Sequence, residues 1–302
     1  MVEGLVSIKK ALGSLNPQHV RELSTQRVHI ALHAANQPAY ERMEEFFLRE
    51  LGAGRRRESA LLLTRAPIAS PADQAIQIHI GDGVADAPPH AIVFQPQREH
   101  HFARTVLATY PEAGVTLARS FKPFRGPFIS NVISKTAREN TLFSVSTALP
   151  DVIPNIIELP WAVAEFASDT AFLTMNQIRM AFLIAAASDR EVGYGQQKSE
   201  VAGVIGSAFG WRALARELVG KIPFGGGLIA KAGIAYAGTR VMGLSLERYY
   251  SIGYSYTRAE RDRVYDDALQ HGRKLALRML HYIRPDLAAK LAGGQAHRQP
   301  PV

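Results

Sequence analysis

The chain has 302 residues and a net charge of +8; 47% of the residues are hydrophobic, 21% are charged, and none is cysteine. This length suits two compact domains, and this balance of apolar and charged residues excludes wholesale disorder. The lack of cysteine excludes disulfide bonds, cysteine-bound zinc and thiol catalysis.

The positive charge fits an anionic membrane surface, the acidic face of a partner protein or a nucleic acid. Nucleic-acid readers gather Lys and Arg on one face and interleave aromatic residues. The densest basic run here is Arg55, Arg56 and Arg57, which we expect in a solvated loop, with anionic lipid or an acidic partner as the alternative. We therefore predict an anionic membrane, a membrane protein or a second copy of the chain as the partner, and no nucleic acid.

The first 121 residues contain two patterns. Residues 1–26 predict a polar leader with a short amphipathic helix from Glu3 to Leu15. This stretch lacks the long apolar core of a cleaved secretory signal, so no such signal is predicted. Residues 27–121 alternate strand and helix patterns, which is typical of a small sheet with helices on its faces. The expected strands are 28–34, 59–65, 75–80, 90–95 and 114–120, and the expected helices are 40–51 and 99–109.

The second half of the chain predicts helices throughout. Residues 122–127 are rich in proline and glycine and are the best linker candidate. The helices expected after them are 128–149, 156–188 with a break at Pro160, 196–220, 222–250 and 257–283. The tail, 285–302, is expected to be disordered. We therefore predict an α+β two-domain fold, with a small α/β domain at 27–121 and an all-α domain at 128–284.

Small residues at helical spacing are the strongest signal in the sequence. They are Gly203, Gly206, Ser207 and Gly210 in helix 196–220, and Ala230, Gly233, Ala237 and Gly238 in helix 222–250. Small residues on one helical face let two backbones approach closely, in membranes and in tight soluble hairpins alike. Pro223 and the following glycines, Gly226 among them, predict a flexible start of the second helix. We predict that these two helices pack as a Gly/Ala-rich hairpin.

Residues 171–187 and 222–246 come nearest to a membrane span, but neither provides the roughly twenty clean apolar residues of a confident one. The polar residues that interrupt them are Asn176, Gln177, Arg179, Lys231 and Arg240. We expect these helices to insert into, or lie on, an anionic bilayer. The basic residues that would face headgroups or partners are Arg212, Arg216, Lys221 and Lys231.

The first half lacks the features of a nucleotide site. A phosphate loop needs glycines, a lysine and a hydroxyl side chain between a strand and a helix, and residues 33–39 (HAANQPA) contain none of these. This excludes a conventional GTPase or ATPase site, and we predict no nucleotide. Gly81-Asp82-Gly83 follows an expected strand and is interpreted as a plain turn, with a metal or phosphate contact as the alternative.

Histidines in the first half leave a metal site open as a weaker hypothesis. His29 and His33 share a face of their expected strand, His79 ends another strand, and His100 and His101 are adjacent. Neighbouring strands would bring two or three imidazoles together, as in the ligand sets of metal enzymes. Scattered, half-buried histidines are the favoured interpretation, so no metal and no cofactor are predicted.

Four carboxylates lie among apolar residues of the second half: Asp151, Glu158, Glu165 and Asp169. Paired carboxylates serve acid–base catalysis, but no nucleophile accompanies them in the sequence. We favour structural roles, in which Asp151 caps a helix and Asp169 pairs with Arg179 or with a basic residue of helix 222–250.

Several features of residues 128–250 are shared with one known family. They are the prolines Pro150 and Pro154, Asp169 followed by Gln177-Ile178-Arg179-Met180, a Tyr194-Gly195 turn, the break from Lys221-Ile222-Pro223 to Gly226, and a helix at 235–243 that contains Thr239. With these features the region resembles the YcjF-like, GTPase-associated helical domain of unknown function. Members are often joined to Era-like GTPase domains, are considered bacterial inner-membrane or membrane-associated proteins, and have no established catalytic activity. The resemblance implies that the first half is a degenerate GTPase-like domain.

We therefore expect a non-enzymatic, membrane-associated scaffold or regulatory protein of this family, cytoplasmic and associated with or inserted in the inner membrane. Two alternatives stay open: a soluble protein-interaction or oligomerisation module, and a metal-dependent enzyme that uses the N-terminal histidines. The residues expected to carry helix packing and interaction are Asp169, Gln177, Arg179, Gly203, Gly210, Pro223, Gly226, Gly233, Gly238 and Thr239.

Overall fold

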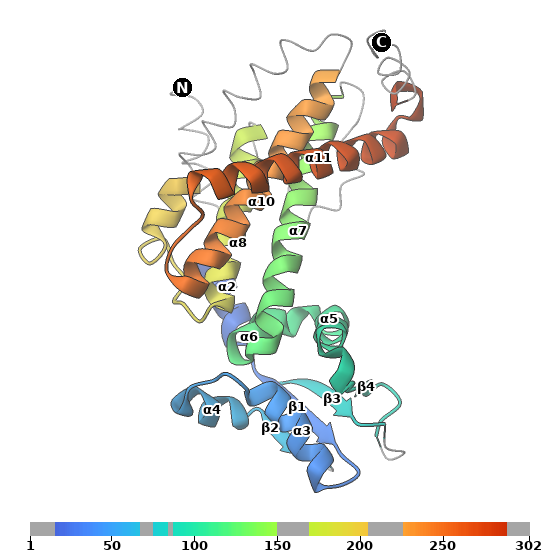
Figure 1. Cartoon of the computed structure of the whole chain (residues 1–302), viewed down its shortest axis with the longest axis vertical. Helices are drawn as coiled ribbons and strands as arrows, with labels where there is room; N and C mark the ends of the chain where they lie inside the picture. Colours follow the sequence, from blue (N-terminus) through green and yellow to red (C-terminus); the bar gives the residue numbers. More distant parts are fainter. Residues whose placement is uncertain (1–15, 67–74, 84–86, 150–168, 205–225, 289–302) are drawn as a thin grey trace. The chain divides into compact units, whose positions relative to one another are not determined.

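The computed structural model describes residues 16–66, 75–83, 87–149, 169–204 and 226–288. These residues form two compact units, whose helices and strands are labelled in Figure 1. The α/β unit contains Pro17–Val132 and Phe182–Gln196, and the helical unit contains the other described residues. Two long helices, α7 (Lys122–Ser146) and α8 (Asp169–Ala187), contribute residues to both units.

The α/β unit begins with a helix and continues as strands connected by loops and short helices. In chain order its elements are α2 (Pro17–Thr25), β1 (Val28–His33), α3 (Gln37–Leu48), α4 (Ala53–Ala60), β2 (Leu63–Arg65), β3 (Ile76–Gly81), β4 (Ile92–Val93), η1 (Pro96–Arg98), α5 (Glu99–Thr109), η2 (Pro111–Ala113), α6 (Gly114–Ser120) and the first part of α7.

The sheet of this unit has four parallel strands in the order β2-β1-β3-β4. In the central strand, Ile30 is paired with Leu63 of β2 and with Ile78 of β3. Side chains alternate between the two faces of a strand, so these three residues share one face, and all three are buried. His29 and His33 of β1 share the opposite face, which is polar and half-buried. The sheet therefore has one apolar face and one polar face.

Phenylalanine rings form much of the core of the α/β unit. Ring centroids are 5.0 Å apart for Phe47 and Phe121, 5.6 Å for Phe47 and Phe124, and 5.1 Å for Phe94 and Phe102. Most of these contacts are edge-to-face, a geometry that adds about 0.5–1.5 kcal/mol per pair to the gain from burial. Because Phe124 belongs to α7, this core includes the first turns of that helix.

Two sequence predictions fail at the end of the α/β unit. Residues 114–120 form helix α6, not a strand, because a short apolar run fits both periods and the turn η2 already starts a helical path. Residues 122–127 form the start of α7, not a linker. Pro127 removes one backbone donor from that helix, and the burial of Phe124 among the phenylalanines outweighs this loss.

Arg55, Arg56 and Arg57 also differ from expectation, since they lie in helix α4 rather than in a loop. The strand expected at 59–65 is confined to β2. Other predictions are confirmed: α5 has the predicted bounds, and β1 and β3 lie within one residue of theirs. The expected leader helix from Glu3 to Leu15 and most of the expected tail lie outside the described residues.

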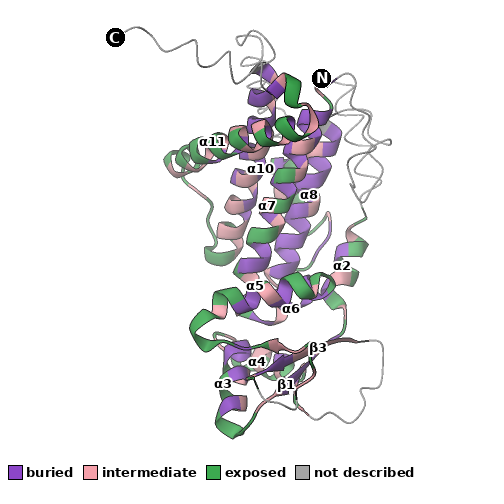
Figure 2. Cartoon of the chain, turned by 90° about the vertical axis from the view of Figure 1, so that its right-hand side faces the viewer, coloured by how far each residue is buried: buried purple, intermediate pink, exposed green. Residues whose placement is uncertain are grey.

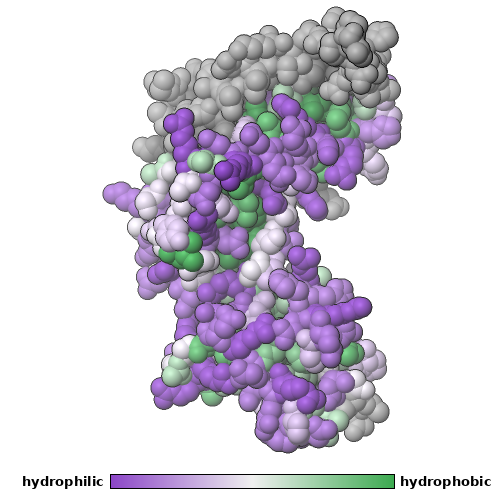
Figure 3. Space-filling view, viewed as in Figure 1, coloured by the Kyte–Doolittle hydropathy of each residue, from purple (hydrophilic) through white to green (hydrophobic). Residues whose placement is uncertain are grey.

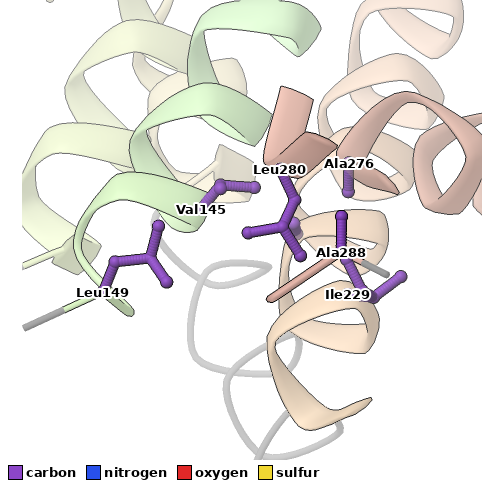
Figure 4. Close-up of a cluster of buried hydrophobic side chains, with 7 residues drawn as sticks. Val145, Leu149, Ile229, Ala276, Leu280 and Ala288 are labelled. Carbon is purple, nitrogen blue, oxygen red and sulfur yellow. The ribbon is translucent and has the colours of Figure 1, made fainter. Parts of the chain in front are cut away.

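The helical unit contains the later part of α7, the first part of α8, a short helix at 198–204, and the long helices α10 (Gly226–Ile252) and α11 (Arg258–Ile283). A capping box starts α11: the hydroxyl of Thr257 accepts from Glu260 N at 3.3 Å, and Thr257 N donates to Glu260 Oε2 at 2.9 Å. Buried side chains of α7, α10 and α11, and of residues shortly after α7 and α11, meet in one cluster, shown in Figure 4. They are Val145, Leu149, Ile229, Ala232, Ala276, Leu280 and Ala288.

Helix α8 is buried on nearly all sides between Ala171 and Ala187, as Figure 2 shows. A helix that is apolar all round belongs to the interior of a larger protein or to a membrane. Within the part of the chain that the structure describes, every helix falls short of the length and apolar character needed to cross a bilayer. In the view of Figure 3, polar residues dominate the surface and hydrophobic ones form small groups.

Candidate functional site

Polar side chains meet inside the helical unit, among helices that are otherwise largely apolar. Thr239 of α10 is fully buried, and its Oγ1 accepts hydrogen bonds from Asn140 Nδ2 of α7 at 2.9 Å and from Gln177 Nε2 of α8 at 3.0 Å. The Thr239 hydroxyl donates to the carbonyl oxygen of Ala235, one turn earlier, at 2.8 Å. One oxygen atom therefore connects three helices.

Asn176 of α8 extends this network. Its Nδ2 donates to Asn140 Oδ1 at 2.9 Å and to Glu139 Oε2 at 3.1 Å. We call Asn140, Asn176, Gln177 and Thr239 the polar node; none of the four is more than 6% exposed. A hydrogen bond contributes a net 1 kcal/mol or so, whereas a buried polar group left without a partner costs about 1–3 kcal/mol. The node therefore acts mainly by making any other alignment of the three helices unfavourable, because buried polar groups would then lose their partners.

Partly buried charges also lie on these helices. Burial lowers the pKa of Arg179 on α8, and the carboxylate of Glu139 opposes that shift. Burial raises the pKa of Glu247 on α10, and Arg240 opposes that shift. In both pairs the opposite charge favours the ionised form that burial disfavours. Glu139 and Arg179 lie on different helices, so their interaction depends on α7 and α8 staying together, whereas Arg240 and Glu247 share α10.

Glycines allow close contacts between helices of this unit. A Cβ on Gly233 of α10 would lie 2.9 Å from Cγ of Arg273 in α11, and a Cβ on Gly243 would lie 2.6 Å from Cγ1 of Ile133 in α7. Real Cβ atoms are essentially never this close to a neighbour, so a larger residue at either position would force the Arg273 or Ile133 side chain to move. Among the described residues, the close approaches of α10 are thus to α11 and α7.

Several expected interaction residues come together in the structure. Gln177 and Thr239 are both members of the polar node. Arg179 lies two residues beyond Gln177 on α8 and next to Glu139. Gly233 lies at the contact between α10 and α11, and Gly238 is buried on α10.

The other expected residues are dispersed. Asp169 and Gly226 are the first residues of α8 and α10. Gly203 is exposed, and no described atom lies within 4 Å of the position of its Cβ. Gly210 and Pro223 lie outside the described residues, so the predicted pairing of helices 196–220 and 222–250 does too. The same holds for Asp151, Glu158, Glu165, Arg212, Arg216 and Lys221.

Sequence reasoning missed two amides of the polar node and two close glycines, Gly243 and Gly272. Asn140 lies in a predicted helix without any distinguishing pattern, and its role depends on residues 36 and 99 positions away. Asn176 was noted only as an interruption of an apolar segment, although a polar residue in such a segment is itself the signal of a buried network. Gly272 of α11 gave no signal, because it stands alone among charged residues.

In the α/β unit, the carboxylate of Asp82, the residue that follows β3, contacts the loop after β1. Asp82 Oδ2 accepts from the backbone N of Ala35 at 3.1 Å, and Asp82 N donates to the carbonyl oxygen of His33 at 3.1 Å. A phosphate loop would direct such backbone N–H groups at a phosphate. Gly83 has a φ of +93°, as a tight turn after the strand requires.

Histidines gather on the polar face of the sheet. His33 Nε2 and His79 Nδ1 are 3.1 Å apart, within hydrogen-bond distance, and the His79 and His90 ring centroids are 4.9 Å apart. Burial lowers the pKa of both His33 and His79, with charge on His90 acting in the same direction. Nowhere in the described ranges do three His, Asp or Glu side chains form a ready-made metal site. His100 and His101 are exposed in the first turn of α5.

Two of the three arginines of the basic run in α4 form ion pairs with carboxylates. Arg55 Nε donates to Asp189 Oδ2 at 2.9 Å, and Arg119 Nε of α6 donates to Asp189 Oδ1 at 3.0 Å. Arg56 Nη2 pairs with Glu45 Oε2 of α3 at 2.6 Å. Two of the three arginines therefore connect elements of the α/β unit, and only Arg57 matches the solvated role expected for the run.

Comparisons with known proteins found no matching family model, no matching curated protein and no matching solved structure.

Proposed function

We propose that this chain is a non-enzymatic scaffold or regulatory protein that associates with anionic membranes, and that it is of the YcjF-like, GTPase-associated type without a nucleotide site of its own. The observation that carries the proposal is the polar node. Three hydrogen bonds join its four side chains across three helices, which suits a unit that keeps helices in one arrangement for docking.

The loop after β1 supports the absence of nucleotide binding. The Asp82 carboxylate already accepts the hydrogen bond of Ala35 N in this loop. A phosphate approaching the same N–H would meet a negative charge about 3 Å away and be repelled. A degenerate GTPase-like unit would keep its sheet and lose this contact to phosphate, so we assign the α/β unit a structural or docking role.

An exposed patch at the end of α10 supports docking to a membrane surface. It consists of Tyr249, Ile252 and Tyr254, which are 44%, 51% and 61% exposed. Exposed basic residues follow at once in α11, at Arg258 and Arg261. Tyrosines and aliphatic side chains beside arginines are typical of surfaces that rest on anionic lipid, since the rings enter the headgroup layer and the charges pair with phosphates.

Fractionation of expressing cells tests the proposal, with membrane pellets washed first in high salt and then in alkaline carbonate. We expect the protein in the membrane pellet, and we expect high salt to release it. The attraction between a chain of net charge +8 and anionic lipid is screened by salt. Retention through both washes would instead mean insertion. Protein found wholly in the soluble fraction would overturn membrane association.

A second experiment locates the contact. We expect the triple variant Tyr249→Ser, Ile252→Ser and Tyr254→Ser to lose sedimentation with vesicles that contain anionic lipid. Leu61→Ser is the matched control, because Leu61 is a large apolar side chain in the α/β unit that is 81% exposed. Equal binding by the triple variant and the control would exclude this patch as the lipid contact.

The alternative is an interaction or oligomerisation module whose partner is a protein. The same patch favours it, because exposed tyrosines are also enriched at protein interfaces. Light scattering of the purified chain distinguishes the two: a dimer that the triple variant converts to monomer, without any vesicle binding, would select this alternative.

A further inference from the structure

The polar face of the sheet holds two imidazoles as a pair with converging nitrogens. His33 is the last residue of β1 and His79 lies on β3. The register pairs His33 with Gly81 and Ala31 with His79, so the two histidines share a face and are offset by two residues. His33 Nε2 and His79 Nδ1 point at each other at 3.1 Å.

That separation suits two nitrogen ligands of one metal ion. Zinc–nitrogen bonds are about 2.0–2.1 Å long, which places two nitrogens of a tetrahedral site about 3.3 Å apart. In the structure, one neutral imidazole donates its N–H to the other nitrogen. Imidazole binds transition metals through either ring nitrogen, so Nε2 of one residue and Nδ1 of the other can serve together.

The position in the sheet is one where ligands bind. The strand order β2-β1-β3-β4 places the connection from β1 on one side and the connection from β3 on the other. The chain therefore diverges at the carboxyl ends of β1 and β3, and open parallel sheets bind ligands in the crevice outside such a point. His33 lies at that end of β1, and His79 lies two residues before the end of β3.

We propose that His33 Nε2 and His79 Nδ1 together bind one transition-metal cation of borderline softness, such as Zn²⁺, Ni²⁺ or Cu²⁺, with water completing its coordination. His90 is exposed, and its ring stands edge-on to His79, so rotation of its side chain adds a third imidazole. The inference does not depend on the scaffold function, and either can fail without the other.

His29 is the matched control, because it lies on the same face of the same strand. Its Nδ1 is 3.2 Å from Gln77 Oε1 and its Nε2 is 3.1 Å from Thr64 Oγ1, so both ring nitrogens are engaged. A metal at His29 would have to displace Gln77 or Thr64, whereas at His33 and His79 it would enter between two imidazole nitrogens. Mg²⁺ is the control ion, because it prefers oxygen ligands.

Titration calorimetry with Zn²⁺, and visible absorption with Co²⁺, test the site on the full chain without an affinity tag. We expect one ion per chain, and at least about tenfold weaker binding in His33→Gln and in His79→Gln, since even changes outside the ligand set lose that much. His29→Gln should bind like the unaltered chain, and Mg²⁺ should not bind. Zn²⁺ should also raise the unfolding temperature of the unaltered chain and not that of the two variants.

Chemical modification keeps the test valid if a variant does not fold. We expect Zn²⁺ to protect His33 and His79 of the unaltered chain from carbethoxylation, read by mass spectrometry. Protection confined to His100 and His101, an undiminished affinity in His33→Gln and His79→Gln, or no binding at millimolar Zn²⁺ would each overturn the proposal.

Discussion

Gly272 of α11 lies so close to α10 that a Cβ on it would be 3.0 Å from the carbonyl oxygen of Gly233 and 2.7 Å from Cβ of Tyr236. Each of these neighbours is backbone or the first atom of a side chain, so neither can rotate away. The two helices therefore cross at a contact that only glycine on α11 permits.

Gly272→Ala should destabilise the helical unit by about 1–3 kcal/mol, because the added methyl forces the helices apart. Intrinsic helix propensity acts in the opposite direction, by up to about 1 kcal/mol. Gly203→Ala is the control, since that helical glycine faces open space among the described residues, and it should be neutral or stabilising. Urea unfolding followed by circular dichroism measures both. Equal stability of the two variants would contradict a tight crossing.

Thr239→Val should cost about 2 kcal/mol or more. Valine has nearly the same shape but no oxygen, so the buried amides of Asn140 and Gln177 each lose their acceptor. Thr239→Ser keeps the oxygen and removes only a methyl group, which costs about 1 kcal/mol. The free energy of unfolding therefore orders the variants as threonine, serine, valine. A valine variant as stable as the serine variant would show that the node contributes no specificity.

Asp189 should contribute to stability through two separate properties. Its carboxylate accepts hydrogen bonds from the guanidinium groups of Arg55 and Arg119. Its backbone φ of +59° lies in the left-handed region, which asparagine adopts more readily than alanine. We expect Asp189→Asn to cost about 1 kcal/mol, since the pair is partly exposed, and Asp189→Ala to cost about 1 kcal/mol more. Unfolding at low and high salt separates the two effects, because only the charge term is screened.

Stability should fall as the pH drops below neutrality. Burial lowers the pKa of His33 and His79 below the value of 6.5 expected when unfolded, so the unfolded chain binds more protons in the window just below 6.5. The free energy of unfolding therefore rises with pH through that window and is fully present above it. The double variant His33→Gln and His79→Gln should show a shallower slope between about pH 5 and pH 7. An unchanged slope would assign the pH dependence to other groups.

Local patterns were sufficient for elements whose period and boundary residues agree. Helix α5 has the predicted bounds because Pro111 stops its apolar period, and α11 starts one residue after its predicted start because Thr257 and Glu260 form a capping box. The alternation in β1 correctly placed His29 and His33 on one face. In each case the deciding interactions lie within a few residues of one another.

Contacts between distant residues decided the elements that were mispredicted. Residues 114–120 are helical although their apolar run fits a strand equally well, and Thr116 in this helix donates to the carbonyl oxygen of Leu23, 93 residues away. Residues 122–127 carry two prolines and a glycine, which locally favour a break, yet burial of Phe124 holds them in α7. Packing energy of several kcal/mol for a buried aromatic ring exceeds such local preferences.

The sequence alone determined the character of this protein's two halves: a region of strands and helices without a phosphate loop, and a helical region rich in small residues. Only the tertiary structure decided which of those residues act together. It joined Asn140, Gln177 and Thr239 in one node and set His33 against His79, because side chains on separate helices or strands meet only when the chain between them has folded. It also turned Gly233 toward α11, since the direction of a helical face depends on what packs against it and not on its spacing.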